Sequence, residues 1–197
     1  KPGLFVCRPE KLEEAQELAW AARVPLVYDL GERGEGSLAA AAAEMPEAFS
    51  TAESAGSDLA AILYTSGTTG RSKGAMLTHR NLAANALVLH QYWGFRPGDV
   101  LLHMLPTFHV HGLFVATHCA LLNGSPMLFE PKFDAQRALR LMREATVFMG
   151  VPTYYVRLLQ EQGLTREAVA HMRLFISGSA PLLPETFSEF RERTGQT

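Results

Sequence analysis

One short segment of the chain combines glycines, hydroxyl side chains and a lysine in a pattern that suits a polyphosphate ligand. It reads Tyr64-Thr65-Ser66-Gly67-Thr68-Thr69-Gly70-Arg71-Ser72-Lys73-Gly74. The glycines let the backbone approach a ligand closely, and exposed N–H groups in such a turn form an anion-binding nest. The hydroxyls of Thr65, Ser66, Thr68 and Thr69 add donors for phosphate oxygens, and Lys73 adds a mobile cation.

The same segment departs from the Walker A phosphate loop. That motif needs Gly-Lys-Ser/Thr after four intervening residues, whereas here Ser72 precedes Lys73 and Gly74 follows it. On the residues alone, the alternative is a surface turn rich in glycine and threonine. The pattern of glycines, hydroxyls and lysine favours a phosphate-binding loop.

A second segment places an aromatic ring, two histidines and a glycine after a predicted strand. It reads Leu105-Pro106-Thr107-Phe108-His109-Val110-His111-Gly112. These residue types at a strand end suit the wall of a small-molecule pocket. His109 and His111 are two residues apart, not the i, i+4 spacing of a helical metal pair, so the pattern does not indicate a zinc site. Packed or solvated histidines are the alternative.

Two further segments lie between a predicted strand and a predicted helix. In Gly150-Val151-Pro152-Thr153 we expect Thr153 to cap the helix, and Arg157 then lies just past the rim of a pocket. A fixed guanidinium there could hold a carboxylate by two hydrogen bonds, although a lone helical arginine is often solvated. The small residues of Ser177-Gly178-Ser179-Ala180-Pro181-Leu182 form either an ordinary turn or a surface for a flat ligand.

The elements that must position these segments alternate regularly. Polar and apolar patterning predicts strands at 4–7, 25–28, 59–64, 100–105, 127–129, 146–149 and 173–176, and helices at 9–22, 81–93, 112–122, 135–144, 153–162 and 184–193. This alternation indicates βαβ units and an α/β fold with a largely parallel sheet covered on both faces. Ligands of such sheets bind outside the carboxyl ends of the strands, where the four segments fall.

The amino-acid composition excludes several classes of protein. Hydrophobic residues make up 47% of the 197 residues, which is enough for a buried core, and the formal net charge of −2 gives no general attraction to nucleic acid or to an anionic membrane. No apolar run reaches the roughly 18 residues that a membrane span needs. A stretch rich in Gly, Ala, Glu and Ser suggests that residues 1–57 are an N-terminal βαβ piece and a connection, and that residues 58–197 are the core portion.

Two distant cysteines, Cys7 and Cys119, indicate neither a disulfide scaffold nor a zinc site. We expect both to be buried, reduced thiols of an intracellular, cytoplasmic protein. The chain does not begin with methionine, which suggests that it was cut from a longer protein. A mitochondrial location would fit if a targeting segment preceded it.

The string Ser66-Gly67-Thr68-Thr69-Gly70-Arg71-Ser72-Lys73-Gly74 resembles the signature loop of the adenylate-forming superfamily, which includes acyl-CoA synthetases, luciferases and peptide-synthetase adenylation domains. The resemblance implies that the chain is part of the large N-terminal α/β domain of such an enzyme. It implies that the loop holds the β- and γ-phosphates of ATP, with a Mg²⁺ ion near Thr65, while a carboxylate attacks the α-phosphorus.

The resemblance also assigns roles to the other segments. Ser177, Gly178, Ser179, Ala180 and Pro181 would pack along the adenine, and Gly150–Thr153 would border the acyl and pantetheine channel. His109 would be a wall or gating residue of the carboxylate and nucleotide pocket, and His111 would reach the acyl group.

Residues 61–194 are most similar to bacterial and mitochondrial malonyl-CoA synthetases within that superfamily. The matching strings include residues 108–116, 131–134, 149–153 and 171–182. Malonate is a short dianion, so a selective site needs a positive group near the distal carboxylate, since a buried unpaired charge is costly. Arg157 is the first candidate for that group and Arg173 the second.

The implied reaction converts malonate, ATP and CoA into malonyl-CoA, AMP and pyrophosphate through malonyl-adenylate, a step of fatty acid metabolism. The alternatives are a ligase for another short acid, methylmalonate or acetate, and a non-catalytic module that binds a nucleotide or a partner. Superfamily members continue with a Mg²⁺-binding glutamate and a mobile C-terminal domain that carries a catalytic lysine. We therefore expect this chain alone to be inactive and, with uncovered sheet edges and apolar faces, to self-associate.

Overall fold

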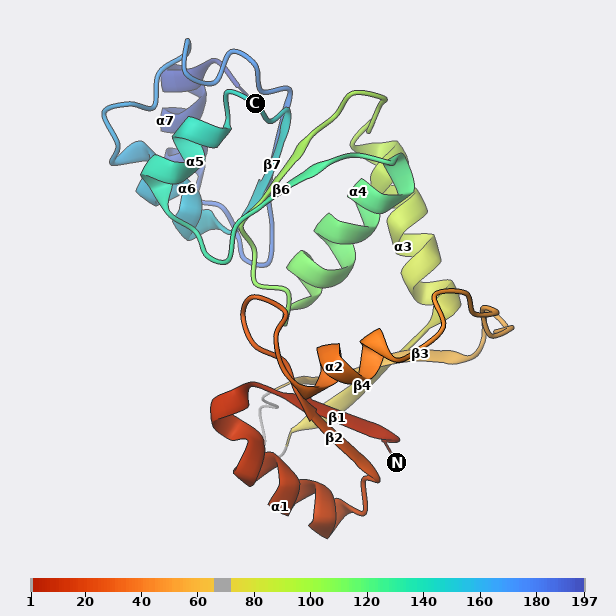
Figure 1. The fold of residues 1–197 in the computed structure, drawn as a ribbon. Coiled ribbons are helices and arrows are strands. Elements are labelled where there is room, and N and C mark those ends of the chain that lie inside the picture. The colour runs from red at the N-terminus through yellow and green to blue at the C-terminus, as the bar shows by residue number, and fades with distance from the viewer. Residues whose placement is uncertain (1, 66–71, 197) are drawn as a thin grey trace. The chain divides into compact units, whose positions relative to one another are not determined.

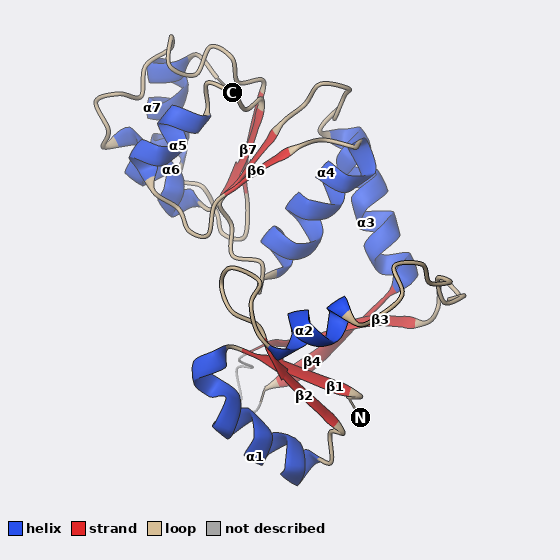
Figure 2. Ribbon diagram, viewed as in Figure 1, coloured by secondary structure: helices blue, strands red, loops and turns tan. Residues whose placement is uncertain are grey.

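The computed structural model describes residues 2–65 and 72–196, which fall into two compact units, Lys1–Glu53 and Ser54–Thr197 (Figure 1). Contacts between residues thus divide the chain after Glu53, whereas composition places the boundary after residue 57. Both units combine helices with strands (Figure 2).

The first unit is a βαβ unit followed by a short helix. Its two strands are parallel, with Leu4 opposite Leu26 and Cys7 opposite Asp29. Ala15 and Ala19, four residues apart on one face of the connecting helix, are buried. The elements are β1 (Leu4–Cys7), the 3₁₀ turn η1 (Pro9–Lys11), α1 (Leu12–Ala22), β2 (Leu26–Asp29) and α2 (Ser37–Ala43). The strands β1 and β2 and the helix between them match the elements predicted from the sequence, whereas Cys7, expected to be buried, is only half-buried.

The second unit begins with an antiparallel hairpin of β3 (Leu59–Thr65) and β4 (Lys73–Thr78), in which Thr65 lies opposite Lys73. The sequence analysis predicted the strand at 59–64 and the helix at 81–93 but missed the second strand between them. The chain turns back to form β4 before the helix begins, and the apolar side chains of β3 are largely exposed, with Tyr64 at 75%. A single apolar run does not reveal whether its partner is a neighbouring strand or a core.

Helix α3 (His79–Tyr92) follows the hairpin and begins at a capping box. The Asn81 N–H donates to Thr78 Oγ1 at 3.2 Å, and the Thr78 N–H donates to Asn81 Oδ1 at 3.0 Å. The helix ends before Gly94, whose φ of +59° belongs to the left-handed region. The helix predicted at 81–93 is thus present, but it begins two residues earlier and ends one residue earlier.

A four-stranded parallel sheet with the order β6-β5-β7-β8 forms the centre of this unit. The order confirms the predicted parallel α/β fold. The strands are β5 (Leu101–His103), β6 (Met127–Phe129), β7 (Val147–Gly150) and β8 (Leu174–Ser177), and the helices are η2 (His111–Ala116), α4 (Thr117–Asn123), α5 (Ala135–Leu141), α6 (Pro152–Leu159) and α7 (Pro184–Thr194).

Successive strand residues enter two separate cores on the two faces of this sheet. Leu102 and Phe148 pack with α5, α6 and α7, whereas Leu101 and Val147 pack with η2 and α4 (Figure 1). Each such side chain contributes about 1.5–3 kcal/mol by leaving water. Helices therefore cover both faces, as the sequence predicted. Among the described residues, no helix is long and apolar enough to cross a membrane.

The amino ends of β5, β7 and β8 are tied together by the carboxylate of Asp99, whose side chain is 2% exposed. Oδ1 accepts from Arg173 Nε and from Thr146 Oγ1, both at 3.0 Å, and Oδ2 accepts from Arg173 Nη2. Thr146 Oγ1 in turn accepts from the Val100 N–H at 2.9 Å. Burial acts to raise the pKa of Asp99, but hydrogen bonds from Arg173, the Arg96 backbone and Thr146 and the charge of Arg173 outweigh it, so the pKa is lowered.

Replacing Asp99 by Asn should lower the free energy of unfolding at pH 7 by about 2–4 kcal/mol, because it leaves the Arg173 guanidinium without its carboxylate. Chemical denaturation of the protein measures the loss. The control is Glu130→Gln, since the Glu130–Arg137 pair at 3.0 Å is more exposed and should cost less than about 1 kcal/mol. Equal losses for the two variants would contradict the role of Asp99.

The same carboxylate should impose a pH dependence. Because the pKa of Asp99 lies below 3.8 in the folded protein, its contribution to stability is complete above that value. The contribution is lost as the pH falls through the lower, folded pKa. The free energy of unfolding should therefore decline more below about pH 4 in the wild type than in Asp99→Asn.

Candidate functional site

The candidate site lies at the carboxyl ends of β5, β7 and β8, where the sequence predicted it. The loops that leave these strands enclose a hollow of about 380 Å³. Residues from all three loops contribute to its wall: Leu105, Pro106, His109, Val110, His111, Gly112, Val151 and Ser179.

The loop after β5 enters a π-helical turn, η2, instead of the regular helix that the sequence predicted from Gly112. The Gly112 carbonyl accepts from the backbone N–H of Thr117, five residues later, and from Thr117 Oγ1 at 2.8 Å. It also lies 2.9 Å from Nε2 of His103. A Cβ at Gly112 would lie 2.3 Å from the Pro106 carbonyl oxygen, so only glycine fits here. Such turns are frequent at functional sites.

His111 joins this turn to the loop after β8. Its Nδ1 lies 3.1 Å from Oγ of Ser179, at hydrogen-bonding distance. Gly178 lies under the ring, where an added Cβ would come within 3.0 Å of His111 Cε1, and its N–H donates to the Gly150 carbonyl at 3.1 Å. Ser179 has φ +68°, a left-handed conformation that non-glycine residues seldom adopt. Such strain is typical of functional sites.

A second hollow, of about 260 Å³, shares Val110, His111 and Ser179 with the first. Its remaining wall comes from α3, η2, β8 and the loop after β8: Leu89, Trp93, Val115, Ile176, Ser177 and Gly178. The hydrogen-bonded pair of His111 and Ser179 therefore borders both hollows.

The surroundings lower the pKa of His103 and His111. Burial lowers the pKa of His111, and the neighbouring His103 lowers it further. Burial also lowers the pKa of His103, against the opposing effect of its bond to the Gly112 carbonyl. The folded protein thus favours the neutral form of His111, which can donate or accept a hydrogen bond.

Aromatic rings hold Arg157 on α6. Its Cζ lies 4.9 Å from the centre of the Phe133 ring, which stacks on Tyr154 at 3.9 Å. Tyr154 in turn donates its hydroxyl to the Met104 carbonyl at 3.3 Å. The Arg157 side chain is exposed to solvent, and its guanidinium packs on the ring of Phe133, which is stacked on Tyr154.

Helix α6 begins one residue earlier than the sequence predicted. Its N-cap is Val151, with Pro152 in the first turn, and Thr153 is not the cap. The fixed φ of proline suits the first helical position and moves the start of the helix toward the strand. The capping role expected for Thr153 was therefore wrong.

The structure brings part of the predicted site together. His109, His111 and Ser179 line the first hollow, and Ser177 and Gly178 join His111 and Ser179 at the second. Thr153, Arg157, Ala180 and Pro181 line neither hollow. Ser66, Gly67, Thr68, Thr69 and Gly70 lie outside the described residues, and the paired backbones of Thr65 and Lys73 flank them.

Arg173, the second candidate for the substrate charge, was misplaced by the sequence analysis. It precedes β8, so it lies at the amino end of the sheet, opposite the site, and both its Nε and Nη2 donate to Asp99. The sequence predicts the strand, but it reveals neither where the side chain of Arg173 points nor which residue it binds. Conversely, His103 and Thr117 contact the site loop although no pattern distinguished them from ordinary residues.

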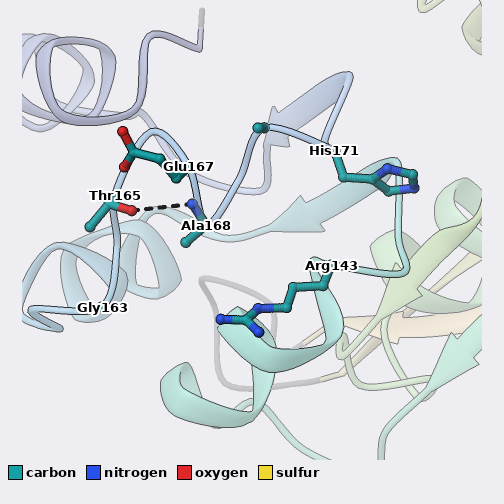
Figure 3. Close-up of a pocket in the computed structure, with 7 residues that line it drawn as sticks. Arg143, Gly163, Thr165, Glu167, Ala168 and His171 are labelled. Atoms are coloured by element: carbon teal, nitrogen blue, oxygen red, sulfur yellow. Dashed lines mark hydrogen bonds between the residues drawn. The ribbon is translucent and has the colours of Figure 1, made fainter.

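A larger hollow of about 610 Å³ lies beyond the amino ends of β7 and β8 (Figure 3). Arg143, Glu167 and His171 are its titratable lining residues, and the Ala168 N–H donates to Thr165 Oγ1 at 3.2 Å. None of the residues predicted for the site lines it. Its place at the amino ends makes it the weaker candidate for a ligand site in a parallel sheet.

Metal ligands are not gathered in the part of the chain that the structure describes: no group of three or more His, Cys, Asp or Glu side chains could hold an ion there. One threonine hydroxyl, such as that of Thr65, does not make a Mg²⁺ site, because Mg²⁺ also needs carboxylates or phosphates. The described residues therefore do not form a Mg²⁺ site by themselves.

Comparison with known proteins gives matches over the whole chain. A family model for AMP-binding enzymes matches residues 3–197. A mitochondrial malonate–CoA ligase of Mus musculus is 38% identical over 100% of this chain. ATP-bound MatB from Rhodopseudomonas palustris is 55% identical over 99% of the chain, with a TM-score of 0.94.

A malonyl-CoA ligase solved with methylmalonyl-CoA and AMP bound is 31% identical over 91% of the chain, with a TM-score of 0.76. The chain spans 36% of the length of the mouse ligase, 39% of MatB and 41% of this third protein. These matches confirm the resemblance to adenylate-forming enzymes.

The lowered pKa of His111 can be tested by NMR titration of its ring, which should give a midpoint below 6.5. Ser179→Ala removes the hydrogen bond but keeps the burial, so the midpoint should stay low in this control. Because the pKa is lower in the folded protein, stability from His111 is complete above 6.5 and lost as the pH falls through the folded pKa. A midpoint at or above 6.5 would show that the ring is hydrated.

Proposed function

Because the chain belongs to the AMP-binding enzyme family, we propose that it forms part of an ATP-dependent ligase that converts malonate, ATP and CoA into malonyl-CoA, AMP and pyrophosphate. The activity is proposed for a longer protein, since the chain spans 36% of its mouse relative. The observation that carries the proposal is the match of the entire chain, site loops included, to a malonate–CoA ligase.

The proposed reaction has two steps. In the first, a malonate oxygen attacks the α-phosphorus of ATP, the bond to pyrophosphate breaks, and malonyl-adenylate forms. In the second, the thiol of CoA attacks the acyl carbon, its proton is lost, and AMP leaves. The first step concentrates negative charge on the departing pyrophosphate, so donors and cations placed around it accelerate the reaction.

The segment from Thr65 to Lys73 is the proposed holder of the phosphates. The antiparallel pairing places Thr65 opposite Lys73, so the described residues on either side of the segment 66–71 are neighbours. Lys73 would then stand beside the leaving pyrophosphate, and the hydroxyls and N–H groups of the segment would bind its oxygens. Ser177 to Pro181 would lie along the adenine, because small residues let a flat base approach the backbone.

Mg²⁺ enters this proposal as part of the Mg·ATP substrate. It would neutralise phosphate charge, and its remaining protein ligands would lie outside the described residues. Thr65 as a ligand stays a prediction from the sequence. The cytoplasmic or mitochondrial location and the self-association of the chain also stay predictions.

Malonate is the proposed acid because several relatives of this chain, from Mus musculus and Arabidopsis thaliana among others, are malonate–CoA ligases. None of the described residues that line the two hollows is a lysine or arginine, so the distal carboxylate needs a positive charge from elsewhere. Arg157, on the helix that begins at the wall residue Val151, remains the proposed source.

Methylmalonate is the second candidate acid. The solved malonyl-CoA ligase with methylmalonyl-CoA bound supports it, because that protein is 31% identical to this chain. One extra methyl group changes binding in an apolar pocket by only about 1–3 kcal/mol, so the two acids must be compared directly.

The phosphate-loop proposal predicts that Lys73→Ala in the full-length ligase lowers kcat for malonyl-CoA formation by about 100-fold. Product formation from malonate, methylmalonate and acetate, followed by chromatography, gives the activity and the preferred acid. The matched control is Lys132→Ala, outside the phosphate segment, which should keep the rate. If the full-length protein binds ATP calorimetrically but forms no acyl-CoA, the non-catalytic module is the better description.

The Arg157 proposal predicts a change in specificity. Arg157→Leu in the full-length ligase should lower kcat/KM for malonate by about 10- to 100-fold, through loss of a charged hydrogen bond, and leave butyrate nearly unchanged. Arg143→Leu, in the hollow at the opposite end of the sheet, is the control. An unchanged ratio of malonate to butyrate would remove Arg157 from this role.

A further inference from the structure

His103 occupies an unusual place for a histidine. It ends β5 with 1% of its surface exposed, and its ring stacks on Phe129 at 4.7 Å between centres. Nε2 lies 2.9 Å from the Gly112 carbonyl oxygen. A carbonyl only accepts hydrogen bonds, so Nε2 carries the proton of the neutral ring.

The other ring nitrogen makes the position informative. Nδ1 of His103 is buried without a hydrogen-bond partner among the described residues. An unpartnered buried nitrogen is destabilising, and an apolar side chain of similar size would fill the space without this cost. Packing alone therefore does not explain a histidine at this position, whereas the hydrogen bond that Nε2 donates does.

That donor acts on the irregular turn of the site. The Gly112 carbonyl accepts from His103 Nε2, from Thr117 Oγ1 and from the Thr117 N–H. In an α-helix this carbonyl would accept from the N–H four residues later, whereas here the fifth residue supplies it. Two side-chain donors thus stabilise the wider π turn at the residue that directly follows His111.

We propose that His103 is a positioning residue that holds Gly112 in the π turn and thereby places His111 against Ser179, between the two hollows. His111 is adjacent to Gly112, and Gly112 is confined by Pro106, so a change at the carbonyl moves the His111 ring. The inference rests on the proposed function in one respect, namely that the acid binds beside His111.

The tautomer of His103 tests the contact without any activity. In selectively ¹⁵N-histidine-labelled protein, long-range ¹H–¹⁵N spectra should show His103 as a neutral ring protonated at Nε2, with His103→Gln assigning the signal by its loss. A ring protonated at Nδ1, or a charged ring at pH 7, would overturn the proposal.

Kinetics of the full-length ligase test the consequence. His103→Leu, which keeps an apolar body but loses the donor, should raise KM for the acid about 10-fold and leave KM for ATP within about twofold. His103→Gln, whose amide N–H can reach the same carbonyl, should recover most of this loss. Thr117→Val should raise the KM for the acid and Thr117→Ser should restore it, because serine keeps the hydroxyl.

A destabilised control separates positioning from general loss of structure. Val169→Ala removes volume from the core on the opposite face of the sheet, where Val169 is fully buried, and should change stability but not KM for the acid. If His103→Leu keeps the wild-type KM for the acid while the wild type forms malonyl-CoA, the inference fails and the proposed function stands. If the wild type forms no acyl-CoA, the proposed function fails, and the tautomer still decides the contact.

Discussion

The carboxylate of Asp99 fixes three short parallel strands at their amino ends, and the arrangement of the site at their other ends depends on this. It binds Arg173 before β8 and Thr146 before β7, and it lies just before β5 itself. Strands of three or four residues span only about 10–13 Å, so an error at one end is carried directly to the other. This charged network lies at the amino ends of the strands, away from the candidate site at their carboxyl ends. A permanent charge at the candidate site would instead change which ligands bind there.

The two ends of the sheet thus use different physical chemistry. At the amino ends an ion pair with several hydrogen bonds stabilises the register, and the pKa of Asp99 is lowered. At the carboxyl ends the contacts are hydrogen bonds of imidazole rings, from His103 to Gly112 and between His111 and Ser179, and burial lowers the pKa of both rings. An ion pair therefore stabilises the sheet at its amino ends. The described residues that line the hollows include no lysine or arginine, so a ligand can bring its own charges there.

Helix caps and strands that depend mainly on neighbouring residues could be predicted from the sequence. Thr78 and Asp134 cap two helices that the sequence predicted, since a cap depends on residues within one turn, and the strands of the parallel sheet follow from apolar runs between turns. One failure is local, since Pro152 moves the N-cap of α6 from Thr153 to Val151, and the others are questions of long-range partners. The sequence could not reveal that β3 pairs with β4, that Arg173 turns toward Asp99, or that the Gly112 carbonyl draws donors from two elements. His103 was missed for this reason, because a buried histidine at the end of a strand has no signature until its acceptor is known.

At Ser179 the free-energy cost of the backbone conformation can be compared with the gain from the hydrogen bond of the side chain. A left-handed conformation at a non-glycine residue costs about 1–3 kcal/mol, whereas a neutral hydrogen bond such as that to His111 returns only about 0.5–1.5 kcal/mol. The bond therefore does not cause the conformation, which follows from the end of β8 and the bond of Gly178 to Gly150. Glycine at this position would remove the strain entirely. The hydroxyl that serine supplies instead faces the imidazole of His111, which borders both hollows.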